Sequence, residues 1–216
     1  MIEKVAYNLG RNDEEPNIAL AIELCNTKDL EGIKEIVNGL INKKEQVAND
    51  CIKVVYEIGE RNPELIGDYV LDFIQLLKSR NNRLVWGSMT AISKITSLKP
   101  KEVFENIEIV IRAYENGSVI TRDNSISVFA ELSKADKEYE KIMFSKILEH
   151  LKTCRPREVG QHSERAFVCV NEKNAKEFVS VLLIRREHLT DAQKKRIDKL
   201  IKMIENNKFN SWYMDL

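Results

Sequence analysis

Turn-forming residues are scarce in this sequence. Among 216 residues there are only 8 glycines and 4 prolines, about half the share of an average globular protein. β-Sandwiches, β-barrels and flexible linkers all depend on many turn residues, so the shortage argues against them. The sequence therefore favours an all-α protein, and we expect one domain over residues 1–216, long enough to bury a sizeable core.

Long apolar runs are also missing. No stretch approaches the roughly 18 apolar residues that a membrane-spanning helix needs. The opening segment, MIEKVAYNLGRNDEE, becomes acidic too early for a secretion signal. We therefore expect a cytoplasmic protein with no membrane span.

The 4 cysteines form no C-x-x-C pair, so we expect free and mostly buried thiols. Four side chains of zinc-binding type do occur close together in the sequence, namely His150, Cys154, His162 and Cys169. The first two are four residues apart and so share one helix face. Their spacing, H-x3-C-x7-H-x6-C, matches no common zinc motif. The sequence thus predicts neither a metal site nor a cofactor.

The formal net charge of zero conceals an asymmetry. Residues 1–150 carry 20 basic and 25 acidic side chains, whereas residues 151–216 carry 14 and 9. The two ends of the chain therefore carry opposite net charge, but the sequence provides no broad basic surface for a nucleic acid.

The dominant signal is an internal repeat with a period of 37 residues. One apolar stripe with i, i+3, i+4, i+7 spacing is found four times, which predicts four helices with one buried face each. The four stripes are Ile33, Ile36, Val37 and Leu40; Val70, Phe73, Ile74 and Leu77; Ile107, Val110, Ile111 and Tyr114; and Phe144, Ile147, Leu148 and Leu151.

The segments between these stripes repeat as well. Apolar sets recur at Ile52, Val55 and Ile58, at Met89, Ile92 and Ile95, and at Ile126, Phe129 and Leu132. Short breaks separate the two helices of a unit, and Pro63 and Pro100 suit the first turn of the second helix. The predicted units are 14–42, 43–80, 81–117, 118–154 and 155–188.

The two ends depart from the repeat, as terminal units of a helical stack commonly do. The first helix is short, about 16–25, and the second helix of the last unit spans about 175–186. A capping box from Thr190 to Gln193 opens a final capping helix over 190–206. In the tail we expect Trp212 or Tyr213 to fold back over that helix.

A 37-residue helix–turn–helix unit of this kind resembles the HEAT and armadillo-like family over roughly residues 14–188. The resemblance implies a right-handed α-α superhelix, a solenoid of four to five helix pairs plus the capping helix. Tetratricopeptide repeats are the alternative, but their period is 34 residues and their Trp, Gly and Tyr pattern is absent from the first helices here.

In a stack of this type the second helix of each pair lines the concave side. The helix face opposite the buried stripe holds three rows with one residue per unit. They are Glu31–Asp68–Glu105–Ile142, Glu35–Asp72–Ile109–Lys146 and Asn38–Gln75–Arg112–Glu149. The first three units are acidic there, which disfavours a phosphate backbone and favours a basic protein segment. The alternative is that these charges serve solubility alone.

Two further surfaces are candidates. Trp86 and Asp123 occupy one repeat position near the start of the first helix, with Arg122 beside them. A plain packing role for Trp86 between units is the alternative.

The second surface is an expected loop over 153–164 that concentrates Arg155, Arg157 and His162, with Arg165 next to it. Guanidinium groups in such a loop suit a phosphate or a carboxylate. The alternative is an ordinary inter-repeat turn.

No strong catalytic motif is present, and 3 histidines offer little acid–base chemistry. The sequence therefore favours a non-enzymatic scaffold that binds a protein partner on its concave face. One enzymatic alternative is a resemblance to the HEAT-like alkylpurine DNA glycosylases, for which Trp86, Arg122 and Asp123 form the nearest constellation. Thr90 stands one turn after Trp86 where that family has an acid, and this puts the alternative in doubt.

Overall fold

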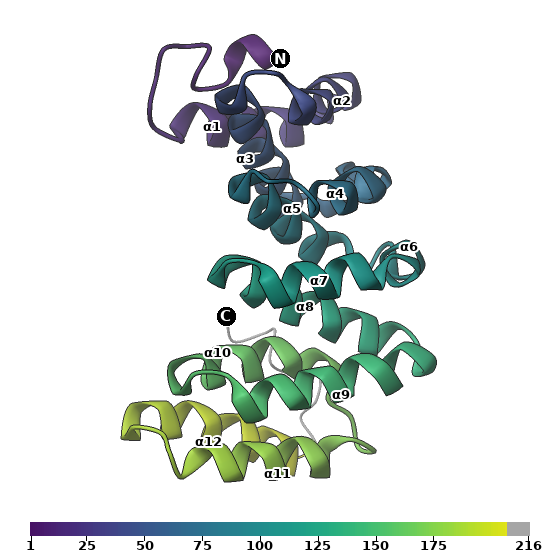
Figure 1. Ribbon diagram of the computed structural model, residues 1–216, viewed down its shortest axis with the longest axis vertical. Helices are drawn as coiled ribbons and strands as arrows, with labels where there is room; N and C mark the ends of the chain where they lie inside the picture. Colours follow the sequence, from purple (N-terminus) through teal and green to yellow (C-terminus); the bar gives the residue numbers. More distant parts are fainter. Residues whose placement is uncertain (207–216) are drawn as a thin grey trace. The chain divides into compact units, whose positions relative to one another are not determined.

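A computed structural model describes residues 1–206 of the chain (Figure 1). Within this part all regular structure is helical, which confirms the predicted all-α class. The α-helices are α1 (Glu15–Thr27), α2 (Leu30–Asn38), α3 (Glu45–Arg61), α4 (Val70–Leu76), α5 (Asn82–Ile95), α6 (Pro100–Glu105), α7 (Ile107–Asn116), α8 (Val119–Ala135), α9 (Lys137–Thr153), α10 (Pro156–Ala166), α11 (Ala175–Arg186) and α12 (Asp191–Glu205). The predicted position of Trp212 or Tyr213 lies outside the described residues.

Short 3-10 helices complete the elements: η1 (Ile2–Lys4), η2 (Gly39–Ile41), η3 (Pro63–Leu65), η4 (Gly67–Tyr69) and η5 (Phe167–Cys169). By its internal contacts the chain divides into two compact units, Met1–Ser125 and Ile126–Leu216. The single domain predicted over 1–216 stays a prediction.

In the first unit the first helices of successive pairs pack on one another, α1 on α3 and α3 on α5. Figure 1 shows these three helices following each other along the unit, with α2 and α4 beside them. The first two apolar stripes predicted from the 37-residue period face the interior, whereas Val110 is the one fully buried member of the third, and its other three residues are half-buried. Ile52, Val55 and Ile58 of α3 are fully buried, as are Met89 and the other repeat-matched residues of α5.

Local sequence signals start and end the helices as expected. Pro63 begins η3 and Pro100 begins α6, where a missing backbone N–H costs nothing. Asp136 caps α9 by accepting a hydrogen bond from the Glu138 backbone N–H. The Thr190–Gln193 capping box opens α12 as predicted.

Two of the second helices are broken where the sequence pattern predicts continuous ones. The segment after Pro63 forms η3, η4 and the short α4. The next unit divides at Asn106, whose side-chain amide donates to the Glu102 carbonyl and so ends α6 before α7 begins. An apolar period survives such a break, so periodicity alone does not reveal it.

The second unit contains α9 to α12. α11 packs on α9 and on α12, and α10 packs on α12. Phe144 of α9 and Phe178 of α11 form a tilted aromatic pair with ring centroids 6.4 Å apart. α11 has the bounds 175–186 that the sequence predicts.

Candidate partner-binding surface

An acidic cluster forms in the first unit around Tyr69. Its members are Glu31 of α2, Asp68 of η4 and Asp72 of α4, all three exposed. Burial raises the pKa of the Tyr69 phenol, and the negative charges of the three carboxylates raise it further. The three carboxylates are therefore close enough to act on one phenol. Glu31 and Asp68 belong to the first predicted row, and Asp72 belongs to the second.

Three of the predicted acids, including Asp68 of the cluster, are engaged within the chain. Glu35 accepts hydrogen bonds from the Met1 amine at 2.8 Å and from the Ile2 N–H at 3.0 Å, and the bond from the amine lowers the pKa of the Glu35 carboxyl. Asp68 pairs with Lys99 at 2.7 Å, and Glu105 pairs more loosely with Lys101 at 3.8 Å.

Two acids of the cluster differ from these. Among residues 1–206, neither Glu31 nor Asp72 has an ion-pair partner. Their charge is thus left for something outside the chain to neutralise.

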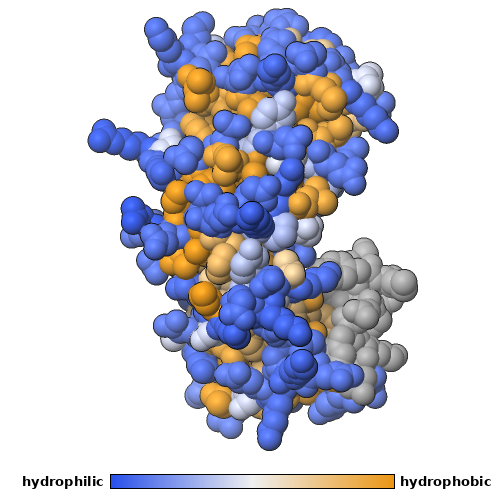
Figure 2. Space-filling model, turned by 90° about the vertical axis from the view of Figure 1, so that its right-hand side faces the viewer, coloured by the Kyte–Doolittle hydropathy of each residue, from blue (hydrophilic) through white to orange (hydrophobic). Residues whose placement is uncertain are grey.

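Apolar side chains adjoin these acids in sequence. Leu30 begins α2 and is 60% exposed, and Leu71 of α4 is 52% exposed. Figure 2 looks onto the side where α2, α4 and α6 lie, and hydrophobic and hydrophilic side chains alternate there over the first unit. Mixed surfaces of this kind can anchor a partner inside a charged rim.

Ile109 and Arg112, predicted in the rows, line a surface pocket of about 570 Å³ in the first unit. Its apolar residues include Leu77, Val85 and Ala113, and Lys78 and Arg80 join Arg112 among its basic residues. This part of the surface is consequently basic rather than acidic. Lys78 and Arg80 were missed because they follow the second helix, outside the rows that helical periodicity identifies.

Ile142 and Lys146 belong to α9 of the second unit. Ile142 is 52% exposed, and Lys146 is half-buried. Both stay candidates for partner contact.

The Trp86 edge is packed. Asn49, Trp86 and Asp123 are each the fifth residue of their helices α3, α5 and α8, which agrees with the shared repeat position. The Trp86 ring lies 5.6 Å from that of Tyr56, and the Arg83 guanidinium lies 5.3 Å from the Trp86 centroid. These contacts favour a packing role for Trp86. Arg122 and Asp123 are half-buried on α8.

Next to this edge is an ion-pair network that sequence analysis missed. Buried Lys53 of α3 donates to Glu57 at 2.7 Å and pairs with Glu14 at 3.0 Å. Arg83 also pairs with Glu14, and Arg61 with Glu57. Each carboxylate of this network has two cationic partners, in contrast with those of Glu31 and Asp72. Links such as Glu14 to Arg83 join distant residues, so no local pattern could reveal them.

The pKa values of this network have opposing causes. Burial would raise the pKa of the Glu14 and Glu57 carboxyl groups, but hydrogen bonds from Lys53 and from Arg83 or Arg61 hold both below the ordinary 4.5. Burial would lower the pKa of Lys53, but the same hydrogen bonds raise it above the ordinary 10.5. The folded chain thus holds the network fully ionised near neutral pH.

A pH dependence of stability follows. Since the folded carboxyl pKa values lie below the unfolded ones, the network stabilises the fold fully above the ordinary pKa of 4.5 and loses this effect as the pH falls below it. We expect Lys53→Met to lower the free energy of unfolding by about 2 kcal/mol at neutral pH. The difference from wild type should shrink toward about pH 3. Urea unfolding at several pH values measures this.

Lys141→Met is the matched control for Lys53→Met. Lys141 pairs with Glu138 on the surface, with both side chains more than two-thirds exposed (68% and 74%). Its loss should change stability by less than about 0.5 kcal/mol. Equal effects of the two substitutions would contradict a stabilising role for the Lys53 network.

Residues 153–164 do not form the loop predicted from the sequence. Pro156–Ala166 is helix α10, started by Pro156 at its first turn. The Glu158 carboxylate accepts from the Arg155 backbone N–H at 3.2 Å and from its side-chain Nε at 2.8 Å. The glycine and proline of this segment suggested a loop, but the proline instead fits the helix start.

The basic residues of this segment consequently have separate surroundings. Arg155 pairs with Glu158, Arg165 donates to the Ser127 hydroxyl at 2.8 Å, and Arg157 is exposed. His162 is fully buried. The expected loop is not present, so the anion site predicted on it has no support.

Other side chains offer little chemistry. Burial raises the pKa of the Cys51 and Cys169 thiols to about 12, which keeps them protonated and unreactive. No helix within residues 1–206 is long and apolar enough to cross a bilayer.

Comparisons with known proteins identify the fold. No protein-family model and no curated protein matches the chain. Among solved structures, an engineered protein is similar over 95% of this chain and 97% of its own, with a TM-score of 0.61 and 15% identity.

Two designed armadillo repeat proteins are also similar. One was computationally designed for modular peptide recognition; it covers 87% of this chain and 91% of its own, with a TM-score of 0.64 and 12% identity. The other, in complex with the peptide (KR)4, covers 84% of each chain, with a TM-score of 0.62 and 13% identity. The chain therefore has an armadillo or HEAT-like helical-repeat fold, as its 37-residue period predicts.

Proposed function

We propose that this protein is a non-enzymatic scaffold that binds a basic peptide segment on the acidic cluster of its first unit. The observation that carries the proposal is that α2, η4 and α4 present three exposed acids, Glu31, Asp68 and Asp72, of which Glu31 and Asp72 have no ion-pair partner in the described residues. This surface is built on the second helices α2 and α4, the side expected to be concave.

The surface has the two components that peptide recognition needs. The carboxylates attract Lys or Arg side chains, each exposed pair contributing up to about 1 kcal/mol. Leu30 and Leu71 offer apolar contact, and burying one such side chain contributes about 1.5–3 kcal/mol. The sum, less the cost of ordering the peptide, corresponds to binding in the micromolar range.

The similarity to designed armadillo repeat proteins supports a peptide partner. One of them was designed for modular peptide recognition, and another was solved with a peptide of alternating Lys and Arg. Because the identities are 12–13%, they support the type of surface and not individual residues. The basic chemistry of the proposed partner rests on the acidic cluster of this chain.

The test is the affinity of the full chain for the fluorescent peptide (KR)4 by fluorescence anisotropy. We expect Glu31→Lys/Asp72→Lys to weaken binding at least tenfold. This pair is chosen because neither residue loses an ion pair with another of the described residues on substitution. Wild-type binding should also weaken with added salt, since exposed charges are screened within about 10 Å at 0.1 M.

A matched control separates a site from general attraction between opposite charges. Glu172→Lys/Glu177→Lys changes the net charge by the same amount at two exposed positions of the second unit. It should weaken binding less than threefold. Equal weakening by both variants, or no wild-type binding at low salt, would contradict the proposal.

A further inference from the structure

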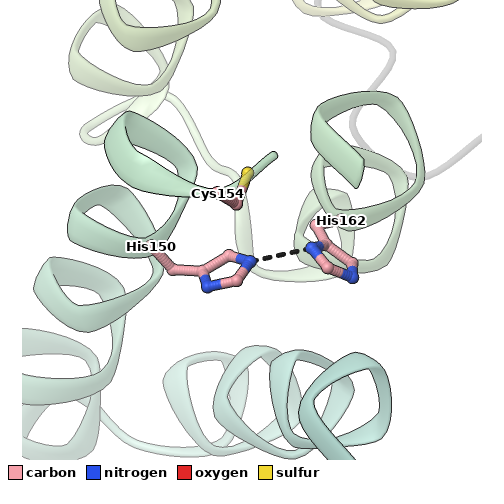
Figure 3. Close-up of side chains that lie close together, drawn as sticks. All are labelled: His150, Cys154 and His162. Carbon is pink, nitrogen blue, oxygen red and sulfur yellow. Dashed lines mark hydrogen bonds between the residues drawn. The ribbon is translucent and has the colours of Figure 1, made fainter. Parts of the chain in front are cut away.

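Two histidines and a cysteine meet in the interior of the second unit. We call His150, Cys154 and His162 the His–Cys cluster. His150 lies near the end of α9, Cys154 is its C-terminal cap, and His162 lies on α10. The two imidazoles face each other between the two helices, and Cys154 lies beside them where the chain leaves α9 (Figure 3). All three are buried, with exposures of 5%, 9% and 0%.

The ligand-type atoms of the cluster are close together. Nε2 of His150 and Nδ1 of His162 are 2.7 Å apart. One ring nitrogen of each histidine and the Cys154 sulfur all lie within 4.8 Å of one another. The two imidazoles are hydrogen-bonded to each other there, so it is the gathering of three ligand-type atoms, and not a lack of partners, that suits a bound ion. Among residues 1–206 this is the one group of three or more His, Cys, Asp or Glu side chains with such an arrangement.

The turn between the helices explains the convergence. α9 ends at Thr153 and α10 begins at Pro156, so only Cys154 and Arg155 connect them. The Cys154 N–H donates to the His150 carbonyl at 2.8 Å, and the Cys154 thiol donates to the Leu151 carbonyl at 3.8 Å, which holds Cys154 one helical turn beyond His150. The following helix then returns His162 to the same place. The unfamiliar seven-residue spacing between Cys154 and His162 is therefore compatible with a shared site.

Cys169, the fourth residue with a suitable side chain, does not join the cluster. Its thiol donates to the Ala166 carbonyl at 3.1 Å instead. The chain thus supplies two imidazole nitrogens and one sulfur.

This donor set fits zinc. Imidazole and thiolate ligands suit Zn²⁺, whereas Ca²⁺ and Mg²⁺ prefer oxygen. Tetrahedral zinc, with bonds of about 2.0 Å to nitrogen and 2.3 Å to sulfur, places its ligand atoms about 3.3–3.7 Å apart. The two imidazole nitrogens need to separate by about 0.6 Å. The Cys154 sulfur must turn toward them about χ1, away from the Leu151 carbonyl to which the thiol donates.

We propose that the His–Cys cluster binds one zinc ion, which links α9 to α10, with a water molecule in the fourth position. On binding, the Cys154 thiol forms the Zn–S bond as a thiolate and releases its proton to solvent. The hydrogen bond between the two imidazoles breaks, and the ring that donated it loses that proton and takes one up on its other nitrogen, so both imidazoles coordinate in their neutral form. No oxidation or reduction occurs. This site lies in the second unit and is independent of the peptide-binding function proposed for the first.

Zinc binding by the full chain tests the proposal directly. After removal of metal with a chelator, the protein is titrated with Zn²⁺ in competition with a chromophoric chelator. We expect one zinc per chain for wild type and at least tenfold weaker binding for Cys154→Ser and for His162→Gln. Cys25→Ser and His188→Gln replace a cysteine and an exposed histidine outside the cluster, and they should bind as wild type does.

Cobalt(II) provides a second measurement that needs no variant. Wild-type protein with Co²⁺ should show the visible bands of tetrahedral cobalt and the near-ultraviolet band of a thiolate bond, and Cys154→Ser should lack the latter. Circular dichroism verifies that each variant keeps its helicity. If a variant unfolds, the wild-type cobalt spectrum decides the matter. Absence of zinc binding by wild type, a cobalt spectrum without a thiolate band, or equal binding by cluster and control variants would overturn the proposal.

Discussion

Alanine in place of Phe178 should lower the free energy of unfolding of the second unit by about 4 kcal/mol. Phe178 of α11 is fully buried, and its ring pairs with that of Phe144 on α9. The substitution removes the ring, leaves a cavity and eliminates the aromatic contact, and these losses act in the same direction. The neighbouring helices cannot close the cavity without losing their own contacts, because α11 packs on both α9 and α12.

Chemical unfolding followed by circular dichroism measures this effect, and hydrogen exchange locates it. In helical repeats each element contacts mainly its neighbours, so amides of α9, α11 and α12 should lose the most protection. Leu183→Ala is the control on the same helix, since Leu183 is 50% exposed. It should cost well under 1 kcal/mol. A loss below about 1 kcal/mol for Phe178→Ala would show that α11 does not pack as described.

The repeat pattern predicts the fold well because helix burial is a local property. The i, i+3, i+4, i+7 stripe places Val70, Phe73 and Ile74 on one face, and all three are buried. The second helix of the last unit lies at 175–186, where its apolar residues place it. Caps such as Thr190 depend only on residues within one turn, so they can also be identified without tertiary information.

The prediction was wrong for the segment 153–164 because two signals competed there. Pro156 and Gly160 favour a turn by composition, yet Pro156 at a first helical turn and Glu158 three residues after Arg155 favour a helix start. The helix forms and buries Val159 and His162. The helical spacing of the buried residues therefore indicates the structure of this segment better than the presence of glycine does.

The candidate sites required the structure for a different reason. The acidic cluster joins residues on separate helices, and Glu31 differs from Glu35 in having no ion-pair partner among residues 1–206. Which acid is neutralised depends on where the Met1 amine lies, and periodicity carries no such information. The His–Cys cluster likewise depends on the path of the two-residue turn between α9 and α10.

A last prediction concerns Gly87, which allows α5 to approach α3 closely. A methyl group at Gly87 would lie 2.5 Å from Cγ1 and 3.2 Å from Cγ2 of Ile52. Ile52 is fully buried and its β-branched side chain is stiff, so it cannot move aside cheaply. On an exposed helix surface the same substitution would stabilise by about 1 kcal/mol through helix propensity. Here we expect Gly87→Ala to destabilise by about 2 kcal/mol net, because overpacking outweighs propensity.

A double-mutant cycle tests whether the Ile52 contact is the cause. Ile52→Ala alone should cost about 3 kcal/mol, since it empties a buried site. In the double variant the new methyl group enters the space that Ile52 vacates, so its cost should fall short of the sum by at least about 1 kcal/mol. Gly67→Ala is the control, because a methyl group there meets the Lys99 side chain at an ordinary 3.5 Å. Strict additivity of Gly87→Ala and Ile52→Ala would mean that the cost of Gly87→Ala arises from something other than the contact with Ile52.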